Sequence, residues 1–416
     1  MKRILLITSE YPTRVATFIT RDIEVLTNDG YKVDLYALYP KNDAQWEYVP
    51  QEGKKLIEQG KLTVNHIRKI EIVLSVLYFW NYFSWDFFKE AKEIMKQSRV
   101  YGIVQWQKSF YTIVWTIGLM RKESEKNKYC KVISYWGNYS GTSAYLFSKY
   151  SKYKLDFFTY LHAGVDLYRD QIYLLEKLLF AKRIITVCQF NKDFLQGLYP
   201  KEFEQFKEKV IVYHLPLKIR QLPKITKLKN KIIAVGRLDR KKGLDYLIEA
   251  CAILKAKKVD FNLTLVGDGP ERKGLENFVE KKGVVNQVDF LGHMPYSEVE
   301  KEISSSIVLA HCSPELGDAV PTVIKESLSL GTPVIGSNIV GIPELLDFGK
   351  CGLLFEPKDT EGLVNALIKV LSDTELQDEM SIKGRQFAEK MFDFDKNKTV
   401  LLNILNNDTN IEKTDK

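Results

Sequence analysis

One pattern occurs twice along this chain: short apolar runs typical of buried strands alternate with longer segments of helical periodicity. Helices between such strands are typical of doubly wound α/β domains with a parallel sheet. At 416 residues the chain is long enough for two domains with separate cores. The predicted strands of the first half are Ile4–Ile7, Val33–Leu38, Gly102–Gln105, Val132–Tyr135, Phe157–Leu161 and Arg183–Cys188. Those of the second half are Lys231–Val235, Asn262–Val266, Val288–Leu291, Ile307–Ala310 and Pro333–Gly336.

The boundary between the two alternations is marked by composition. Residues 216–230 hold two prolines, several Lys and Arg residues and no acid, which is typical of an interdomain linker. We therefore predict an N-terminal domain over residues 1–215 and a C-terminal domain over residues 231–395. A last helix, at about residues 396–410, can pack back on the N-terminal domain.

Charge is distributed unevenly between the halves. Residues 1–215 hold 32 Lys+Arg against 23 Asp+Glu, whereas the rest holds 29 against 30. A basic first half is compatible with an anionic partner, such as membrane phospholipid or a pyrophosphate-linked lipid, and equally with a merely solubilising surface. The basic residues are dispersed, which disfavours nucleic-acid binding. The five cysteines form no C-x-x-C pair, so we expect a reducing, cytoplasmic location rather than disulfides or zinc.

The most apolar segment is Ile72–Phe88. Asn81, Ser84 and Asp86 interrupt it, and it is shorter than the roughly 20 apolar residues that span a bilayer. A buried helix is one interpretation. The alternative is a surface that touches the membrane or a lipid acceptor through Trp80 and Trp85.

The second half contains two glycine turns that follow predicted strands. The first, Gly236–Gly243 (GRLDRKKG), carries Arg237 and Lys242 between its glycines. These cations suit a diphosphate, Arg as a two-pronged donor and Lys as a point charge. The second turn, VGDGP, leads into a predicted helix at Pro270. Taken alone, each turn is equally compatible with an ordinary surface loop that connects a strand to a helix.

A third junction follows the strand Ile307–Ala310, where a loop with Asp318 leads into a helix that carries Glu326. A helix N-terminus offers unpaired N–H groups, and loops at strand ends border the clefts of α/β domains. The two acids could hold hydroxyls of one polyol ligand. Alternatively, Asp318 only favours the positive helix end and Glu326 is solvated. Taken together, the three junctions indicate a site for a sugar diphosphate.

The order of these motifs resembles a known enzyme family. GRLxxKKG, VGDGPxR, VxFLGHMP, an acid-x7-E helix running into GTPVI, then GIPELL and GLLF are similar to retaining glycosyltransferase family four, within glycosyl transferases group 1. The resemblance covers most of residues 231–395, whereas the first half is less similar. It implies the GT-B fold, in which two Rossmann-like doubly wound parallel-sheet domains face each other across a cleft.

The resemblance also implies roles for individual residues. Arg237 and Lys242 would hold the donor diphosphate and neutralise the charge that grows on it. Glu326 would accept hydrogen bonds from ribose hydroxyls, and Asp318, where the family usually has glutamate, would contact the donor sugar. The remaining nucleotide contacts would come from pocket-lining glycines, two backbone N–H groups and a loop against the base: Gly236, Gly267, Gly269, Ala319, Val320, and His293 and Met294 within Gly292–Pro295.

In the first half, the family carries a histidine near the sugar, usually as H-G-x-D. This chain has LHAGVD, so His162 and Asp166 are one residue further apart, and His162 is a candidate catalytic residue together with Arg237, Lys242 and Asp318. The N-terminal loop also departs from the family pattern. Instead of a glycine pair it reads SEYPTRVATFITRDIE, similar to a branch of exopolysaccharide and cell-surface glycan enzymes.

These features imply transfer of a sugar, with retention, from a UDP- or GDP-sugar to a glycan or lipid-linked acceptor. No separate cofactor and no metal are expected, since Arg237 and Lys242 supply positive charge and no D-x-D metal motif stands out. The alternatives are a nucleotide-sugar epimerase and a non-catalytic glycan-binding scaffold with the same fold. A Rossmann dehydrogenase is disfavoured because no G-x-G-x-x-G follows the first strand.

Overall fold

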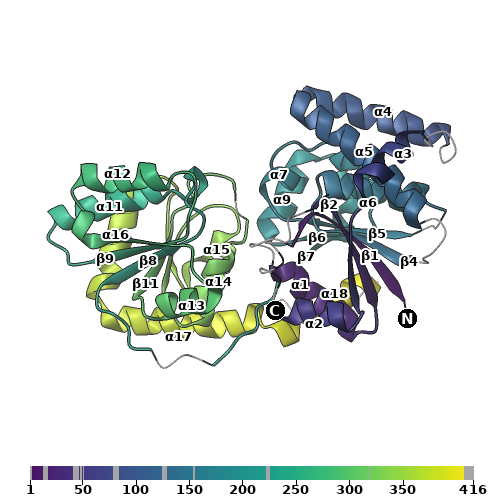
Figure 1. Ribbon diagram of the computed structural model, residues 1–416. Helices are drawn as coiled ribbons and strands as arrows, with labels where there is room; N and C mark the ends of the chain where they lie inside the picture. The colour runs from purple at the N-terminus through teal and green to yellow at the C-terminus, as the bar shows by residue number, and fades with distance from the viewer. Residues whose placement is uncertain are drawn as a thin grey trace. The chain divides into compact units, whose positions relative to one another are not determined.

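The chain forms two compact units in a computed structural model, which describes residues 2–12, 17–40, 46, 49, 51–77, 84–123, 129–152, 155–221, 225–317 and 319–406. The first unit comprises residues 1–187, 191–215 and 398–416, and the second comprises residues 188–190 and 216–397. Each unit has its own sheet, and the end of the chain returns to the first unit (Figure 1). Asp318 and Trp80 lie outside the described residues.

The first unit is built on a seven-stranded parallel sheet with the order β3-β2-β1-β4-β5-β6-β7. β1 pairs with both β2 and β4, and the strands are added outward from it, first on one side and then on the other. This is the order of a doubly wound sheet. The strands are β1 (Arg3–Tyr11), β2 (Lys32–Pro40), β3 (Leu62–Asn65), β4 (Tyr129–Ser134), β5 (Asp156–Leu161), β6 (Arg183–Thr186) and β7 (Val210–Val212).

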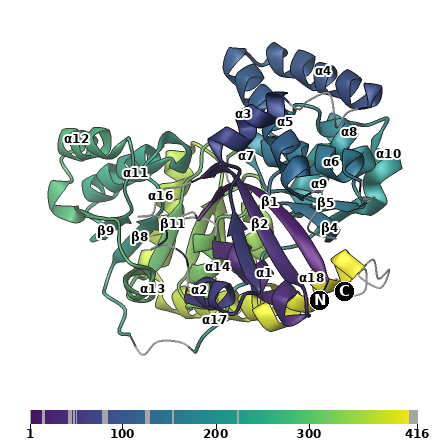
Figure 2. The same ribbon diagram turned by 45° about the vertical axis from the view of Figure 1, so that its right-hand side comes forward.

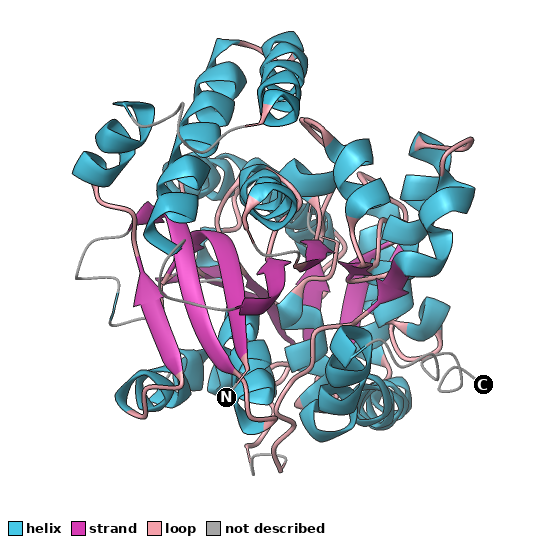
Figure 3. Cartoon of the chain, turned by 90° about the vertical axis from the view of Figure 1, so that its right-hand side faces the viewer, coloured by secondary structure: helices cyan, strands magenta, loops and turns pink. Residues whose placement is uncertain are grey.

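Helices cover both faces of this sheet, as Figure 3 shows for the strands nearest the N-terminus. They are α1 (Thr17–Asn28), α2 (Gln51–Glu58), α3 (Lys69–Leu77), α4 (Trp85–Val100), α5 (Ile103–Glu123), α6 (Tyr139–Tyr150), α7 (Gly164–Leu167), α8 (Leu174–Phe180), α9 (Gln189–Leu198) and α10 (Phe203–Phe206). A 3-10 turn, η3, spans Lys207–Lys209, and α18 (Phe394–Asn406) reaches this unit from the second. The Tyr31 hydroxyl donates to Asn406 Oδ1 at 3.0 Å, which ties the end of α18 to the first unit.

Buried carboxylates that accept hydrogen bonds from tyrosines are a feature of the first core. Asp22 accepts from three tyrosine hydroxyls, Glu90 from three more and Glu123 from two. A buried carboxylate is tolerated only with such partners. The donors are Tyr135, Tyr160 and Tyr213 for Asp22; Tyr145, Tyr150 and Tyr173 for Glu90; and Tyr36 and Tyr129 for Glu123.

The second unit is built on a six-stranded parallel sheet with the order β10-β9-β8-β11-β12-β13. Its strands are β8 (Lys231–Val235), β9 (Asn262–Val266), β10 (Val288–Gly292), β11 (Val308–His311), β12 (Val334–Ser337) and β13 (Leu353–Phe355). Both faces are buried: Ile232 belongs to one apolar cluster and its neighbour Ile233 to the other. Burial on both faces is why these strands read as continuous apolar runs.

The helices of the second unit follow the strands in alternation (Figure 2). They are α11 (Leu244–Ala256), α12 (Arg272–Lys282), α13 (Tyr296–Ser304), α14 (Thr322–Ser329), α15 (Ile342–Leu345), α16 (Thr360–Ser372) and α17 (Thr374–Met391), with 3-10 turns η4 (Arg240–Lys242), η5 (Val285–Gln287) and η6 (Asp347–Gly349). The segment before β8 packs on this unit. The Leu217 N–H donates to the Phe392 carbonyl at 2.6 Å, and Lys227 Nζ donates to the Ser306 carbonyl at 2.8 Å.

Two predicted elements of the first half are wrong. The apolar run Gly102–Gln105 is not a strand, because Ile103 begins the long helix α5. The segment Ile72–Phe88 is not one helix: α3 ends at Leu77, and α4 begins at Trp85, where the Ser84 hydroxyl accepts a hydrogen bond from the Phe87 N–H at 3.3 Å. Among the described helices, none has the length and apolar composition needed to cross a bilayer.

Candidate active site

In the second unit, the loops that follow β8, β9 and β10 are joined to one another by backbone hydrogen bonds. The Leu238 N–H donates to the Asp268 carbonyl at 3.0 Å, and the Glu271 N–H donates to the Leu238 carbonyl at 3.0 Å. The Gly267 N–H donates to the Gly292 carbonyl at 2.8 Å. Because parallel strands end at one edge of the sheet, these bonds hold the glycine turns that the sequence singled out at a common edge.

Close backbone approaches explain two of the glycines in these loops. A Cβ on Gly269 would lie 2.3 Å from the Leu238 carbonyl oxygen. A Cβ on Gly243, which has φ +60°, would lie 2.0 Å from the carbonyl oxygen of Cys312 in the loop after β11. Neither position can accept a side chain without backbone movement, so both glycines are required for loop contact.

Lys242 lies against the first turn of this loop. A Cβ on Gly236 would be 3.3 Å from Lys242 Cε and 3.8 Å from Nζ, so the ammonium is close to the Gly236 backbone. Both residues line a small cavity together with Arg237, His311 and others. The structure therefore places the Lys242 charge at the carboxyl end of β8, where the strand gives way to the glycine turn.

Arg237 is more exposed than Lys242. Its side chain is 69% exposed, and its Nε lies 3.5 Å from Asp239 Oδ2. The other carboxyl oxygen of Asp239 accepts from the Lys241 N–H at 3.2 Å, which caps the turn η4. A solvent-screened pair of this kind contributes little to stability. Arg237 can therefore exchange this contact for an anion with little energetic loss.

Sequence reasoning missed a buried polar pair formed by the last residue of β11 and the loop that follows it. His311 and Ser313 are both buried, and the Ser313 Oγ lies 3.1 Å from His311 Nε2. His311 also lines the cavity beside Lys242. The one signal in the sequence is that His311 directly follows the predicted strand Ile307–Ala310, at the same edge as the glycine turns.

The helix that carries Glu326 is α14. Ala319 is buried before it, Val320 is half-buried, and Pro321 stands at the N-cap. Glu326 is half-buried in the second turn of α14. The predicted partner acid, Asp318, is outside the described residues, so its predicted sugar contact stays a prediction.

The loop after β10 contributes an exposed and a half-buried residue. Gly292 has φ +72°, a left-handed conformation that favours glycine. His293 is exposed, whereas Met294 packs against the apolar cluster on one face of the sheet. Of the predicted pair, only His293 therefore presents most of its side chain to a ligand in solution.

His162 lies in the first unit, directly after β5. Its ring packs among four aromatic rings, with centroids 5.0 Å from Phe18, 5.6 Å from Trp136, 5.6 Å from Tyr160 and 6.5 Å from Tyr135. Asp166 binds the backbone of this loop, since Oδ2 accepts from the His162 N–H at 2.8 Å and Oδ1 from the Ala163 N–H at 2.9 Å. Burial raises the pKa of Asp166 to about 6. These hydrogen bonds act in the opposite direction, because they favour the charged form.

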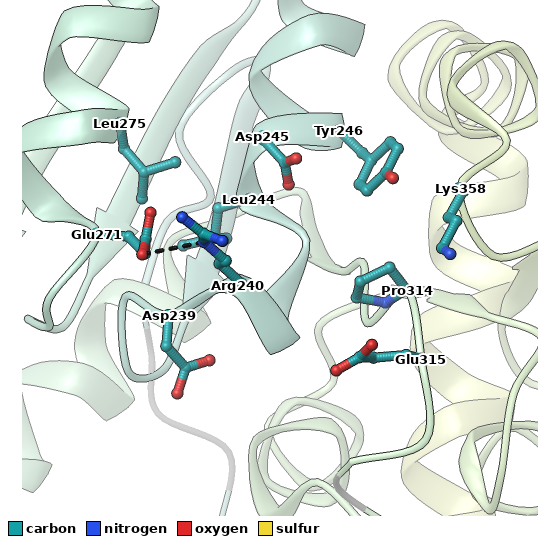
Figure 4. A pocket seen from close by; sticks show the side chains of 10 residues that line it. All are labelled: Asp239, Arg240, Leu244, Asp245, Tyr246, Glu271, Leu275, Pro314, Glu315 and Lys358. Carbon is teal, nitrogen blue, oxygen red and sulfur yellow. Dashed lines mark hydrogen bonds and ion pairs between the residues drawn. The ribbon is translucent and has the colours of Figure 1, made fainter.

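A larger pocket of about 500 Å³ lies beside the glycine turns of the second unit, and Figure 4 shows its side chains. It contains none of the predicted catalytic residues. Four carboxylates but only two cations line it, and the cation Arg240 is paired with Glu271 at 3.3 Å. An anionic diphosphate therefore fits this pocket poorly. The lining residues are Asp239, Arg240, Leu244, Asp245, Tyr246, Glu271, Leu275, Pro314, Glu315 and Lys358.

With this geometry in place, comparison with known proteins assigns the second unit to a family. Residues 217–387 match the family described as glycosyl transferases group 1. The second unit is a group 1 glycosyltransferase domain. All of the predicted site residues from Gly236 to Glu326 lie inside the matched range, whereas His162 lies outside it.

Known relatives are about 30% identical to parts of this chain. An uncharacterized glycosyltransferase of Haemophilus influenzae is 30% identical over 210 residues, which is 50% of this chain and 56% of that protein. A putative colanic acid biosynthesis glycosyltransferase, WcaL, of Salmonella typhimurium is 33% identical over 33% of this chain and 35% of that protein. An amylovoran biosynthesis glycosyltransferase, AmsK, of Erwinia amylovora is 29% identical over 34% of this chain and 35% of that protein. The matches thus span about half or less of these relatives.

Solved structures resemble both units, beyond the group 1 glycosyltransferase domain. HepE of Anabaena, solved with UDP, has 18% identity and a TM-score of 0.69 over 98% of this chain and 100% of that chain. Sucrose-phosphate synthase of Thermosynechococcus elongatus has 15% identity and a TM-score of 0.70 over 98% and 99%. These similarities confirm the predicted GT-B fold class, with its two parallel sheets.

Proposed function

We propose that this protein is a retaining glycosyltransferase that moves a sugar from a nucleotide-diphosphate sugar to a glycan or lipid-linked acceptor in cell-surface polysaccharide biosynthesis. The observation that carries the proposal is the Lys242 ammonium beside the Gly236 backbone, within a group 1 glycosyltransferase domain. Relatives named for colanic acid and amylovoran biosynthesis support the product class. Structures of HepE solved with UDP and with UDP-glucose support a nucleotide-sugar donor.

In the proposed reaction, the acceptor hydroxyl oxygen bonds to the anomeric carbon on the face from which the diphosphate leaves. The bond from that carbon to the diphosphate oxygen breaks, and its electron pair goes to the diphosphate. A donor phosphate oxygen takes the hydroxyl proton, so no enzyme nucleophile is needed. The enzyme stabilises the charge that develops on the leaving group through preplaced cations and N–H groups. Such electrostatic stabilisation is usually the largest single contribution to catalysis.

We assign this charge stabilisation to Lys242 and Arg237. Lys242 is held against the loop backbone, and Arg237 offers a planar, two-pronged donor from an exposed position. Since these two cations supply positive charge, we expect the transfer to proceed in EDTA. The backbone N–H groups of Ala319 and Val320 would assist, ahead of the helix α14.

The remaining assignments concern the rest of the donor. Glu326 would accept hydrogen bonds from the ribose hydroxyls, and the loop from Gly292 to Pro295 would lie against the base. Asp318 and His162 would contact the sugar. The location we propose is the cytoplasm, with peripheral contact at the inner face of an anionic membrane, where lipid-linked acceptors are presented.

The first test is a thermal-shift screen of the purified protein with UDP, GDP, ADP, CMP and NAD, followed by the matching nucleotide sugars. A ligand that binds only the folded state raises its stability by about 2.7 kcal/mol at a hundredfold excess over Kd. We expect a shift with one nucleoside diphosphate, which identifies the donor base. A shift with NAD alone, or with no nucleotide or nucleotide sugar, contradicts the proposal and favours a dehydrogenase or a non-catalytic scaffold respectively.

A further inference from the structure

Exposed apolar side chains gather on one part of the first unit. Of the ten large hydrophobic residues that are exposed among its described residues, nine lie on α3, α4, α5 and the turn between α4 and α5. Such a concentration is more than the scattered exposure of an ordinary surface. The nine are Ile70, Val73, Trp85, Phe88, Val100, Tyr101, Ile103, Val104 and Phe110.

Helix α4 is the outermost of these elements. Figures 1 and 2 show it on the side of α5 that faces away from the sheet. Its inner stripe, at spacings of three and four, is buried: Phe87, Glu90, Ile94 and Ser98. Its outer stripe has the same helical spacing, is exposed and consists of four cations: Lys89, Lys92, Lys96 and Arg99. We call these four residues the cation row.

The two ends of the cation row are apolar. At the start of α4, the exposed Trp85 ring stacks on Phe88, with centroids 6.3 Å apart. At its end, Val100 is 83% exposed and Ile103, on the first turn of α5, is 65% exposed. With about 1.5 Å per residue, the strip from Trp85 to Val100 is roughly 22 Å long. Positive charge therefore lies between two apolar anchors on one outward-facing strip.

The cation row is available to an outside partner. Among the described residues, the cation row makes one ion pair. It joins Lys96 Nζ to Glu93 Oε2, which are 3.7 Å apart. Glu93 and Asp86 lie beside the row rather than within it, as their helical positions show. Exposed i,i+3 pairs of this kind are weak and are readily exchanged.

The inner face of α4 is firmly attached. The Glu90 carboxylate accepts from Lys149 Nζ at 2.9 Å and from the Tyr173 hydroxyl at 2.8 Å, besides the hydroxyls of Tyr145 and Tyr150. Burial acts to raise the pKa of Glu90, but these hydrogen bonds outweigh it and lower the pKa. Because the charged form is stabilised, the strip is held in place near neutral pH before any partner binds.

We propose that this strip, the cation row with Trp85 and Phe88 at one end and Val100 to Val104 at the other, docks on the surface of an anionic lipid bilayer. Lysine and arginine near the headgroups attract anionic lipid, while tryptophan and aliphatic side chains enter the headgroup boundary. The proposal gives a surface to the peripheral membrane contact in the proposed function, on which it rests. It shares Trp85 with the sequence-based hypothesis, in which Ile72–Phe88 made the contact, and adds the cation row and the start of α5.

Charge complementarity selects this occupant over the other candidates. A second copy of the chain seated on the same strip would bring two cation rows together, which is repulsive. A nucleic acid would satisfy the four cations but would leave the aliphatic end of the strip exposed to water. An anionic bilayer satisfies both kinds of side chain at once.

The test is vesicle sedimentation with the full chain at low salt. Vesicles of phosphatidylcholine with 30% phosphatidylglycerol are compared with vesicles of pure phosphatidylcholine. The variant replaces the cation row as Lys89→Gln, Lys92→Gln, Lys96→Gln and Arg99→Gln. A matched control removes the same charge from exposed positions of the second unit, as Lys257→Gln, Lys273→Gln, Lys281→Gln and Lys369→Gln. Trp85→Ala tests the apolar end.

We expect the native chain to bind the anionic vesicles at least tenfold more tightly than the neutral ones. Each Lys or Arg near an anionic surface contributes roughly fivefold, so the cation-row variant should lose at least tenfold in partition coefficient. The control should change by less than threefold, and Trp85→Ala should lose about threefold to tenfold. Native circular dichroism and thermal unfolding show whether each variant is folded, and Lys96→Gln alone provides a milder substitution if the fourfold variant unfolds.

Three outcomes would overturn the docking proposal. They are absence of native binding to anionic vesicles, equal losses in the cation-row variant and the control, and a concentration-dependent dimer that Trp85→Ala abolishes. None of them depends on a donor sugar. If docking fails but sugar transfer to a water-soluble acceptor is normal, the proposed function still holds. If the chain binds vesicles but binds no nucleotide, only the proposed function is refuted.

Discussion

Gly267 passes so close to Gly236 that a Cβ on Gly267 would lie 1.9 Å from the Gly236 carbonyl oxygen. Gly267 also has φ +129°, a conformation that other residues rarely adopt. The turn after β9 is thus packed on the turn that carries Arg237 and Lys242. The geometry of the proposed diphosphate site therefore depends on a glycine that need not touch the donor at all.

Gly267→Ala should consequently destabilise the chain through this backbone contact. Overpacking and a strained φ together cost roughly 3 kcal/mol, and thermal unfolding of the full chain measures the loss. Gly283→Ala is the matched control, because it has φ +68° but nothing within 4 Å of its added Cβ, so only about 1 kcal/mol of backbone strain is expected. Equal losses in the two variants would show that the contact with Gly236 is unimportant.

Lys242→Ala should reduce the rate of sugar transfer by a hundredfold or more while leaving thermal unfolding nearly unchanged. Removal of one group that stabilises a leaving anion typically costs about this much. Initial rates with the donor identified in the nucleotide screen measure the effect. Lys241→Ala removes the same charge from the adjacent position of the same turn and should cost less than fivefold. A normal rate in the Lys242 variant would refute its assignment.

Glu326→Gln should weaken donor binding more than it slows the bound reaction. Hydrogen bonds to a charged group contribute about 1.5–3 kcal/mol, so Kd for the nucleoside diphosphate should rise roughly tenfold or more. Titration calorimetry measures Kd directly. Glu280→Gln, at an exposed position of α12, is the control and should leave Kd unchanged. An unchanged Kd in the Glu326 variant would mean that this carboxylate does not bind the ribose.

Much of the second unit could be predicted from sequence, because both faces of its sheet are buried. Burial on both faces produces apolar runs, and the glycine turns follow them directly, as at Val235–Gly236 and Val266–Gly267. The first unit was less predictable. The run Gly102–Gln105 is too short to distinguish strand from helix, and the helix α5 is decided by residues further on, such as Trp115 and Ile117, that enter the core.

The polar interior of the first unit could not be predicted at all. Asp22 reads as an ordinary acid on an amphipathic helix. Its three partners come from positions 135, 160 and 213, and only the parallel sheet brings them together. The same holds for the site: sequence order indicated Lys242 beside a glycine turn, but not that His311 lines the same cavity.

The buried Asp22 also predicts a pH dependence of stability. Burial raises its pKa to about 6, although hydrogen bonds from Tyr135, Tyr160 and Tyr213 act to lower it. Between about pH 4 and pH 6 the folded chain binds a proton at Asp22 that the unfolded chain has lost, so this group's contribution to stability falls as pH rises through that window. The total change is about 3 kcal/mol for a shift of this size.

Asp22→Asn keeps the shape of the neutral acid and removes its titration. Relative to the native chain, this variant should therefore become more stable as pH rises from 4 to 7, by up to about 3 kcal/mol, whatever the offset between the two proteins at pH 4. Thermal unfolding at pH 4, 5, 6 and 7 measures the trend. The comparison with the native chain cancels the other groups that titrate in this range, including Asp166, whose pKa burial also raises to about 6. Asp29→Asn, at an exposed position just after α1, should show no such trend. A constant difference between the Asp22 variant and the native chain would mean that Asp22 keeps the ordinary pKa of an aspartate despite its burial.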